Sequence, residues 1–289
     1  MQPVATGPGG GRLLRLRLDL GYDGTDFSGW AAQPGRRTVQ GVLEQALATV
    51  LRVEPPRLIV AGRTDAGVHA TGQVCHVDVD PAAWAGVPGR SGLSPGDAVV
   101  RRLAGVLPAD LRVFSVRPAP AGFDARFSAL WRRYTYRVAD SAHRPDPLRR
   151  SAVLWQPRAL DVSAMNNAAG TLVGTHDFVA FCRPRAGATT IRTLRELVCA
   201  RTADGLVVTT AEADAFCHHQ IRAMVGALLA VGAGRRPPDW PAQVLSAGVH
   251  DSAVTVVAPH GLVLEAVGYP PDDELAGRAA TTRSRRTTQ

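Results

Sequence analysis

A single aspartate occupies a turn between two expected strands, in the segment IVAGRTDAGVHATGQVCHVDV. Asp65 follows Arg63 by two positions, and Gly62 and Gly67 flank the pair. Glycines at such places let another backbone or a ligand come close, which would present the carboxylate to that ligand. Ordinary turn chemistry is the alternative, since aspartate bonds its own backbone and glycine accepts positive φ. The residue types alone leave both interpretations open.

Two tyrosines stand beside two arginines in the expected strand WRRYTYRVAD. Tyr134 and Tyr136 share one face of this strand and follow Arg132 and Arg133. Aromatic residues of a strand commonly pack in a core. Aromatic rings beside arginines also hold a nucleic-acid base that has left its stack, so this strand is a second candidate for ligand binding.

A histidine and an arginine lie four positions apart in FCHHQIRAMVGALLAVGAG, which has the apolar spacing of a helix that begins near Cys217. His218 and Arg222 would therefore share a face of this helix, away from its apolar stripe. One interpretation is a solvated basic face. The other is a cation that holds the carboxylate of Asp65 ionised.

Histidine and cysteine also cluster at residues 217–219, and His176 precedes Asp177, so a metal site has to be considered. Neighbouring residues of a helix point about 100° apart, and no further ligand follows at a zinc-like spacing, so we expect no metal site. The sequence also lacks a P-loop, a paired-glycine dinucleotide fingerprint and a serine nucleophile elbow. We therefore expect no nucleotide cofactor.

The composition favours a globular protein with a polyanionic partner. The chain has 289 residues, 45% of them hydrophobic, and a formal net charge of +8. Its 33 basic residues are all arginine, whose planar and permanently charged side chain suits phosphate and stacks on rings. Nucleic acid is the partner that this composition suggests, although a compositional bias that only aids solubility would look the same.

The cysteines and the hydropathy pattern bear on where the protein works. Four scattered cysteines with no C-x-x-C pair indicate neither a disulfide framework nor a zinc knuckle, and they fit a reducing cytoplasm. The N-terminal segment lacks the apolar core of a secretory signal, and no stretch reaches the ~18 apolar residues of a membrane span. We expect a cytoplasmic protein with no membrane contact.

The elements that must position these residues follow the same order in two halves. In the first half we expect a strand at 12–20, a helix at 38–51, strands at 57–61 and 72–79, a Gly/Pro loop at 83–97, a helix at 97–107 and a strand at 111–120. In the second half we expect a strand at 131–140, a helix at 162–174, a hairpin that turns at Asp204 and Gly205, a helix at 216–234 and a strand at 261–269.

This repeat predicts an α+β fold of two similar halves, each a mostly antiparallel sheet with helices on one face, related by a pseudo-twofold axis with an active-site cleft between them. We expect a disordered segment over residues 1–11, an N-terminal domain with the aspartate turn over 12–120, a C-terminal domain over 121–271 and a disordered arginine-rich tail over 272–289. The tail is either solvated or follows RNA phosphates.

Seven segments form a recognisable pattern along roughly residues 13–270: YDGTDFSGW, TVQGVLEQAL, GRTDAGVHATGQV, FDARFSALWRRYTYRV, GTHDFVAFC, FCHHQIRAMVGALLAVGAG and APHGLVLEAVGY. In this order they resemble the TruA family of tRNA pseudouridine synthases, and the block GRTDAGVHA is highly specific. Ala31 departs from the glutamine usual in that family, and the loop at 84–97 looks longer than typical. Neither departure touches the expected chemistry.

The resemblance implies a reaction and the residues for it. It makes Asp65 the catalytic aspartate, Tyr134 the residue that packs on the target base, Arg222 the basic residue beside the aspartate and Arg63 an aid in extracting the nucleotide. The implied reaction turns uridine into pseudouridine at positions 38, 39 and 40 of the tRNA anticodon stem-loop after base flipping, without cofactor or metal, in a homodimer across which one tRNA binds. Two rivals stay open: a non-catalytic tRNA-binding or chaperone protein, and an isomerase acting on another RNA.

Overall fold

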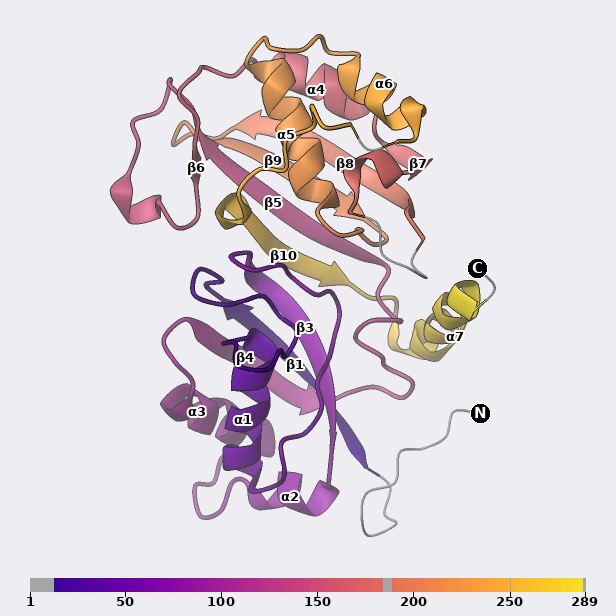
Figure 1. The fold of residues 1–289 in the computed structure, drawn as a ribbon. Helices are drawn as coiled ribbons and strands as arrows, with labels where there is room; N and C mark the ends of the chain where they lie inside the picture. Colours follow the sequence, from indigo (N-terminus) through magenta and orange to yellow (C-terminus); the bar gives the residue numbers. More distant parts are fainter. Residues whose placement is uncertain (1–12, 184–188, 250, 288–289) are drawn as a thin grey trace. The chain divides into compact units, whose positions relative to one another are not determined.

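The computed structural model describes residues 13–183, 189–249 and 251–287 (Figure 1). These residues divide into two compact units. Unit 1 contains the chain up to Leu130 together with the segment that starts at Val267, and unit 2 contains Trp131–Ala266. Among the described residues, no helix combines the length and the apolar character needed to cross a membrane.

Unit 1 is a small antiparallel sheet with helices. The strand order is β4-β1-β3, and the short strand β2 pairs with β3. Helices α1 and α3 contact each other, and α3 also packs against β4. The elements of this unit are β1 (Leu14–Tyr22), α1 (Val39–Leu51), β2 (Ile59–Val60), β3 (His69–Val79), α2 (Pro81–Gly86), α3 (Pro95–Val106), β4 (Leu111–Pro118) and, after a 3-10 turn at Asp272–Glu274, α7 (Leu275–Thr287).

The first strand and helix of unit 1 form where the apolar spacing predicts them. In β1 the alternate residues Leu16, Leu18 and Leu20 are buried, because successive side chains of a strand point to opposite faces. Helix α1 begins where the Thr38 hydroxyl accepts a hydrogen bond from the Gly41 N–H at 3.3 Å, which satisfies one of the unpaired donors of the first turn.

Unit 2 contains strands in the order β10-β5-β9-β8-β7, mostly antiparallel, and β6 lies parallel to β5. Helices α4, α5 and α6 contact one another, and α4 also packs against β8 (Figure 1). The elements are β5 (Trp131–Ala139), β6 (Leu154–Trp155), α4 (Val162–Gly170), β7 (Gly174–Asp177), β8 (Ile191–Arg201), β9 (Val207–Ala213), α5 (Gln220–Gly232), α6 (Trp240–Ala247) and β10 (Leu262–Gly268), with 3-10 turns at Pro147–Arg149, Val179–Phe181 and Pro259–Gly261.

The two units share one internal topology. The order β4-β1-β3-β2 in unit 1 corresponds to β10-β5-β9-β8 in unit 2, and the helix pair α1 and α3 corresponds to α4 and α5. The β8–β9 hairpin turns at Gly205, whose φ of +85° favours glycine, as the Asp-Gly pair predicts. The expected α+β fold of two similar halves is confirmed.

The boundary between the compact units lies at residue 130 and not near residue 120, where the prolines led us to expect it. The reason is a buried apolar cluster in unit 1. Phe123 and Ala125 pack there with Ala61, Val74 and Leu275, so the segment after the prolines belongs to the first core. The expected disordered segment at residues 1–11 lies outside the described residues.

The C-terminal segment is the main departure from the expected organisation. We expected a disordered tail over residues 272–289, whereas the described part of it forms a 3-10 turn and then α7. Leu275 and Ala279, one helical turn apart, are buried at 2% and 0% exposure. Two apolar residues are too sparse a pattern to reveal a helix in a polar sequence.

The expected Gly/Pro loop also contains regular structure. Helix α2 occupies its first residues and begins at Asp80, whose carboxylate accepts a hydrogen bond from the Ala82 N–H at 2.8 Å. Pro81 at the first helical position has the φ angle that a helix start needs.

Candidate active site

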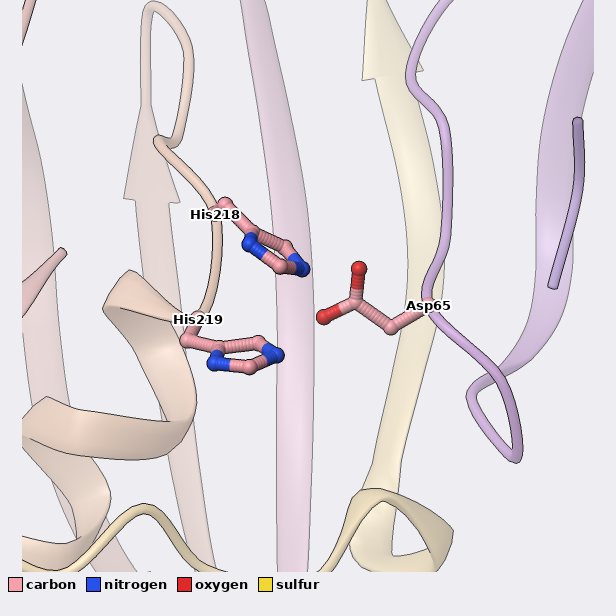
Figure 2. Close-up of side chains that lie close together, drawn as sticks. All are labelled: Asp65, His218 and His219. Carbon is pink, nitrogen blue, oxygen red and sulfur yellow. The ribbon is translucent and has the colours of Figure 1, made fainter. Parts of the chain in front are cut away.

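Asp65 lies in unit 1 on the loop between β2 and β3 (Figure 2). Its side chain is half-buried. The Val68 N–H donates to the Asp65 carbonyl at 3.2 Å, which closes a tight turn. Gly67 takes a φ of +77° within that turn, a conformation that glycine adopts without strain. The sequence therefore placed the aspartate and the glycine of this turn correctly.

A neighbouring backbone segment comes very close to the aspartate turn. The Trp30 N–H donates to the Thr64 carbonyl at 3.1 Å. Gly29 has a φ of +92°, and a Cβ atom there would lie 3.0 Å from the Thr64 carbonyl oxygen. The loop of the segment YDGTDFSGW, residues 22–30, thus makes the close approach that glycine permits, and it supports the aspartate turn from one side.

Three buried side chains hold the loop at its base. The Tyr22 hydroxyl is 2.8 Å from Thr64 Oγ1, and Gln73 Nε2 donates both to Tyr22 Oη at 3.1 Å and to the Gly62 carbonyl at 2.9 Å. Burial raises the pKa of Tyr22 to about 12, so its hydroxyl stays neutral. Sequence reasoning missed these positioning residues, although Tyr22 opens a segment that it had singled out.

Arg63 and Thr64 point to different environments on this loop. Arg63 is exposed, whereas Thr64 is 7% exposed and fixed by Tyr22. The loop therefore presents an exposed guanidinium and a half-buried carboxylate from a rigid backbone. Such an arrangement can bind an anionic ligand and place one carboxylate oxygen against it.

Tyr134 lies in unit 2 on β5, paired with Ala211 of β9. It is 7% exposed, and its ring packs edge-on against Phe216 with centroids 5.4 Å apart. Tyr136 is fully buried, and its hydroxyl donates to the Ala258 carbonyl at 2.7 Å. Both tyrosines thus contribute to packing in unit 2.

The turn before α5 differs from the expected geometry. Helix α5 begins at Gln220, so His218 and His219 precede it (Figure 2). His219 takes a left-handed φ of +69°, which is uncommon for a residue with a side chain. The expectation that His218 and Arg222 share a helix face is therefore wrong. Strained conformations of this kind cluster at functional sites, which makes the turn a candidate.

The two imidazoles of this turn lie outside the helix, so one reason for expecting no metal site does not hold. Their ring centroids lie 3.8 Å apart. The divergence expected of neighbouring helical residues does not apply outside the helix. By itself the turn offers two nitrogen ligands, fewer than the three or four protein ligands that zinc usually takes.

Cys182 and Cys217 form a disulfide with a Cα–Cα distance of 5.8 Å. We expected no disulfide framework because the four cysteines are scattered and form no C-x-x-C pair. The two bonded cysteines are 35 positions apart. The fold brings them together by placing the end of the Val179–Phe181 turn beside the β9–α5 turn. The Cys217 N–H also donates to Gln220 Oε1 at 3.0 Å, and both contacts fix the chain that enters α5.

Arg222 lies in the first turn of α5 and is half-buried. Its Nε donates to the Val257 carbonyl at 2.7 Å, and the Val257 N–H donates to the Arg222 carbonyl at 3.3 Å. The guanidinium is therefore held at a defined place in unit 2. A fixed and permanently charged group is what a role in holding a carboxylate ionised would need.

Comparison with known proteins identifies the class. A protein-family model described as tRNA pseudouridine synthase matches residues 21–128 and 168–270, which cover most of both units. The chain therefore belongs to the tRNA pseudouridine synthase family.

Relatives that carry a more specific name span almost the whole chain. It is 58% identical to tRNA pseudouridine synthase A of Streptomyces avermitilis, over 95% of both chains. It is 58% identical to the protein of that name from Frankia casuarinae, over 94% of this chain and 95% of the relative. The same name belongs to a Mycobacterium leprae relative that is 49% identical over 94% and 96% of the two chains.

Proposed function

We propose that this protein is a tRNA pseudouridine synthase that converts uridine to pseudouridine at positions 38, 39 and 40 of the anticodon stem-loop. Its family membership over both units carries this conclusion, together with relatives named tRNA pseudouridine synthase A. The rigid loop that presents Asp65 supports it, because the reaction needs one well-placed carboxylate.

The reaction moves the bond between base and ribose from one atom of the base to another. The bond from uracil nitrogen 1 to the ribose anomeric carbon breaks, the base rotates, and carbon 5 bonds to the same sugar carbon. The hydrogen of carbon 5 leaves as a proton and nitrogen 1 takes up a proton, so that substrate and product have the same composition. Breaking a glycosidic bond builds positive charge on the sugar, which a carboxylate stabilises. One carboxylate suffices because no water is added and the base returns to the ribose.

We assign the chemical step to Asp65. Its carboxylate either bonds covalently to the anomeric carbon and is later displaced by carbon 5, or removes a proton from the neighbouring sugar carbon and later returns it. In both routes the aspartate is regenerated. Water must be kept from the sugar during the exchange, since its attack would leave an abasic site.

Of the other three residues, two bind the nucleotide and one acts on the Asp65 carboxylate. Tyr134 packs on the target base, Arg222 keeps the carboxylate ionised, and Arg63 helps to extract the nucleotide from the stem. Flipping a nucleotide costs a few kcal/mol of unstacking. The contacts that Tyr134 and Arg63 make with the flipped nucleotide offset part of that cost.

The arginine-rich surface recognises RNA mainly by its backbone and shape. All 33 basic side chains are arginine, which binds phosphate through a planar pair of donors. The deep major groove of an RNA stem hides its sequence, so base pairs are not read there. We further propose that the enzyme works in the cytoplasm as a homodimer and needs neither metal nor nucleotide cofactor.

Mapping pseudouridine in cellular tRNA tests this function. A strain that lacks the gene should lose pseudouridine at positions 38–40, and the wild-type gene should restore it. Asp65→Asn should not restore it, whereas Glu54→Gln, which removes an exposed carboxylate of the same unit, should. Restoration by Asp65→Asn would favour a tRNA-binding protein without catalysis. A loss confined to another RNA would favour an isomerase with a different substrate.

A further inference from the structure

Helix α7 lies beyond the last residue matched by the family model and is built into unit 1. Leu275 is buried against Phe123 and Ala125, and Ala279 is fully buried. At Gly122, where φ is +76°, a Cβ atom would lie 2.5 Å from the Cβ of Ala276. The helix therefore packs directly on the backbone at Gly122.

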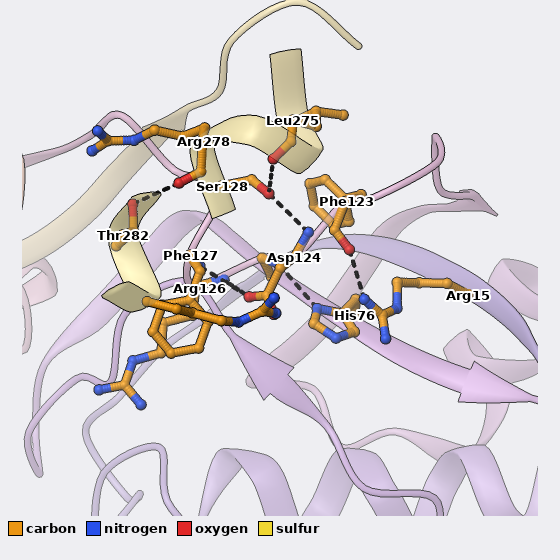
Figure 3. A network of polar contacts seen from close by, with 12 residues as sticks. Arg15, His76, Phe123, Asp124, Arg126, Phe127, Ser128, Leu275, Arg278 and Thr282 are labelled. Carbon is orange, nitrogen blue, oxygen red and sulfur yellow. Dashed lines mark hydrogen bonds and ion pairs between the residues drawn. The ribbon is translucent and has the colours of Figure 1, made fainter. Parts of the chain in front are cut away.

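A buried carboxylate ties the far end of α7 to the turn at residues 123–128 (Figure 3). Asp124 is 6% exposed, and its Oδ2 accepts a hydrogen bond from the Arg283 guanidinium at 2.6 Å. Its Oδ1 accepts the N–H groups of Arg126 and Phe127, each at 2.9 Å. A buried charge needs such partners, so this ion pair fixes where the helix lies.

The same turn and helix place two guanidinium groups over one aromatic ring. Arg126 is exposed and lies 5.4 Å from the centroid of Phe127, and Arg283 lies 4.9 Å from it. Arg278 precedes Arg283 on α7, and Figure 3 shows its guanidinium directed away from the Asp124 network. We call these four side chains, Arg126, Phe127, Arg278 and Arg283, the α7 surface.

The charge of the helix is one-sided in sequence as well. The segment Leu275–Thr287 contains four arginines and no acidic residue. Guanidinium groups fixed around a ring present planar donors suited to phosphate, and the ring edge can contact a sugar or base. An anionic polymer with aromatic units matches both features.

We propose that the α7 surface binds the phosphate backbone of the tRNA substrate outside the target nucleotide. This inference rests on the proposed function and adds a contact region to it. A membrane is a poorer occupant, because interfacial helices carry large apolar residues on one face and α7 exposes small ones such as Ala276, Gly277 and Ala280.

Binding measured at several salt concentrations tests this assignment. The double variant Arg126→Gln/Arg278→Gln leaves the Arg283–Asp124 pair intact. Its matched control is Arg101→Gln/Arg102→Gln, which removes two exposed arginines from α3 of the same unit and lowers the net charge equally. Dissociation constants for unmodified tRNA would come from filter binding between about 50 and 200 mM salt.

The double variant should bind tRNA about tenfold more weakly than wild type, and its slope of log K against log salt should be less steep by about 1.5, since each phosphate contact contributes about 0.7–0.9. The control should keep the wild-type slope. Equal slopes in the two variants would overturn the inference. A different result would also overturn it: wild type binds anionic lipid vesicles or polyglutamate, and the double variant loses that binding but binds tRNA as wild type does. Should the double variant be unstable, Arg278→Gln alone gives the same test with half the expected change.

The outcome is independent of the catalytic assignment. The α7 surface is judged by tRNA affinity alone, and the proposed function by pseudouridine formation in the wild-type enzyme. Wild type that forms pseudouridine, with no change of slope in the double variant, would reject only the inference. Wild type that forms none, with the expected change of slope, would reject only the function.

Discussion

The hydroxyl of Tyr22 offers a direct test of how the Asp65 loop is positioned. Tyr22→Phe removes one oxygen that is 2.8 Å from Thr64 Oγ1 and 3.1 Å from Gln73 Nε2. Gln73 keeps its hydrogen bond to the Gly62 carbonyl, whereas the buried Thr64 hydroxyl loses the Tyr22 oxygen as its partner. Two buried hydrogen bonds at about 1 kcal/mol each give an expected loss of about 2 kcal/mol in the free energy of unfolding.

The same change should slow the reaction more than it weakens tRNA binding. Thr64 precedes Asp65 directly, so a loosened Thr64 displaces the carboxylate, and a displacement near 1 Å costs up to about 100-fold in rate. We expect turnover to fall about 10- to 100-fold with tRNA affinity within about threefold of wild type. Single-turnover release of tritium from tRNA labelled at carbon 5 of uridine measures the rate, and urea unfolding measures the stability.

Tyr269→Phe is the matched control for Tyr22→Phe. It removes a hydroxyl of unit 1 that donates to the Ala125 carbonyl at 2.8 Å. We expect it to cost about 1 kcal/mol in stability and to leave the rate unchanged. A Tyr22→Phe enzyme that is folded and reacts as fast as wild type would refute the positioning role of this hydrogen bond.

Three further predictions concern pH, redox state and Tyr134, to which we assign packing on the target base. Burial, reinforced by nearby positive charge, lowers the pKa of His76 from 6.5 to about 4. The unfolded chain therefore binds a proton first as the pH falls, and stability in urea should drop by about 3 kcal/mol between pH 6.5 and 4, a dependence that His76→Gln should lack. Reduction of the Cys182–Cys217 disulfide should lower the stability of unit 2 by about 3–4 kcal/mol in thermal unfolding, and a double serine variant should not respond to reductant. Tyr134→Leu should lose turnover far more than tRNA affinity. Its control is Phe216→Leu, which removes the same edge-on ring contact and should keep the wild-type rate. Equal rates for Tyr134→Leu and wild type would show that the tyrosine serves packing alone.

Local patterns predicted the regular elements near the site. Alternation in β1 and four-residue spacing in α1 are signals that lie within a few neighbouring residues, and the structure forms both. The turn that carries Asp65 was equally visible, because Gly67 marks a left-handed position in sequence. These features depend on short-range chemistry, which a sequence displays directly.

Contacts between distant residues explain what the sequence did not reveal. Tyr22 meets Thr64 across 42 positions, and Arg283 meets Asp124 across 159. No spacing rule links such pairs, so the support of the Asp65 loop and the order of α7 emerge only in the folded chain. Helix α5 likewise begins at Gln220 and not near Cys217, because His219 takes a left-handed φ before it. Apolar periodicity could not show this.

The decisive measurement is tritium release from tRNA labelled at carbon 5 of uridine, made with wild type and Asp65→Asn at matched tRNA occupancy. Isomerisation at Asp65 predicts full release by wild type and by Glu54→Gln, and no release above background by Asp65→Asn although it still binds tRNA. Full release by Asp65→Asn would contradict the account, because the carboxylate would then not take part in the reaction.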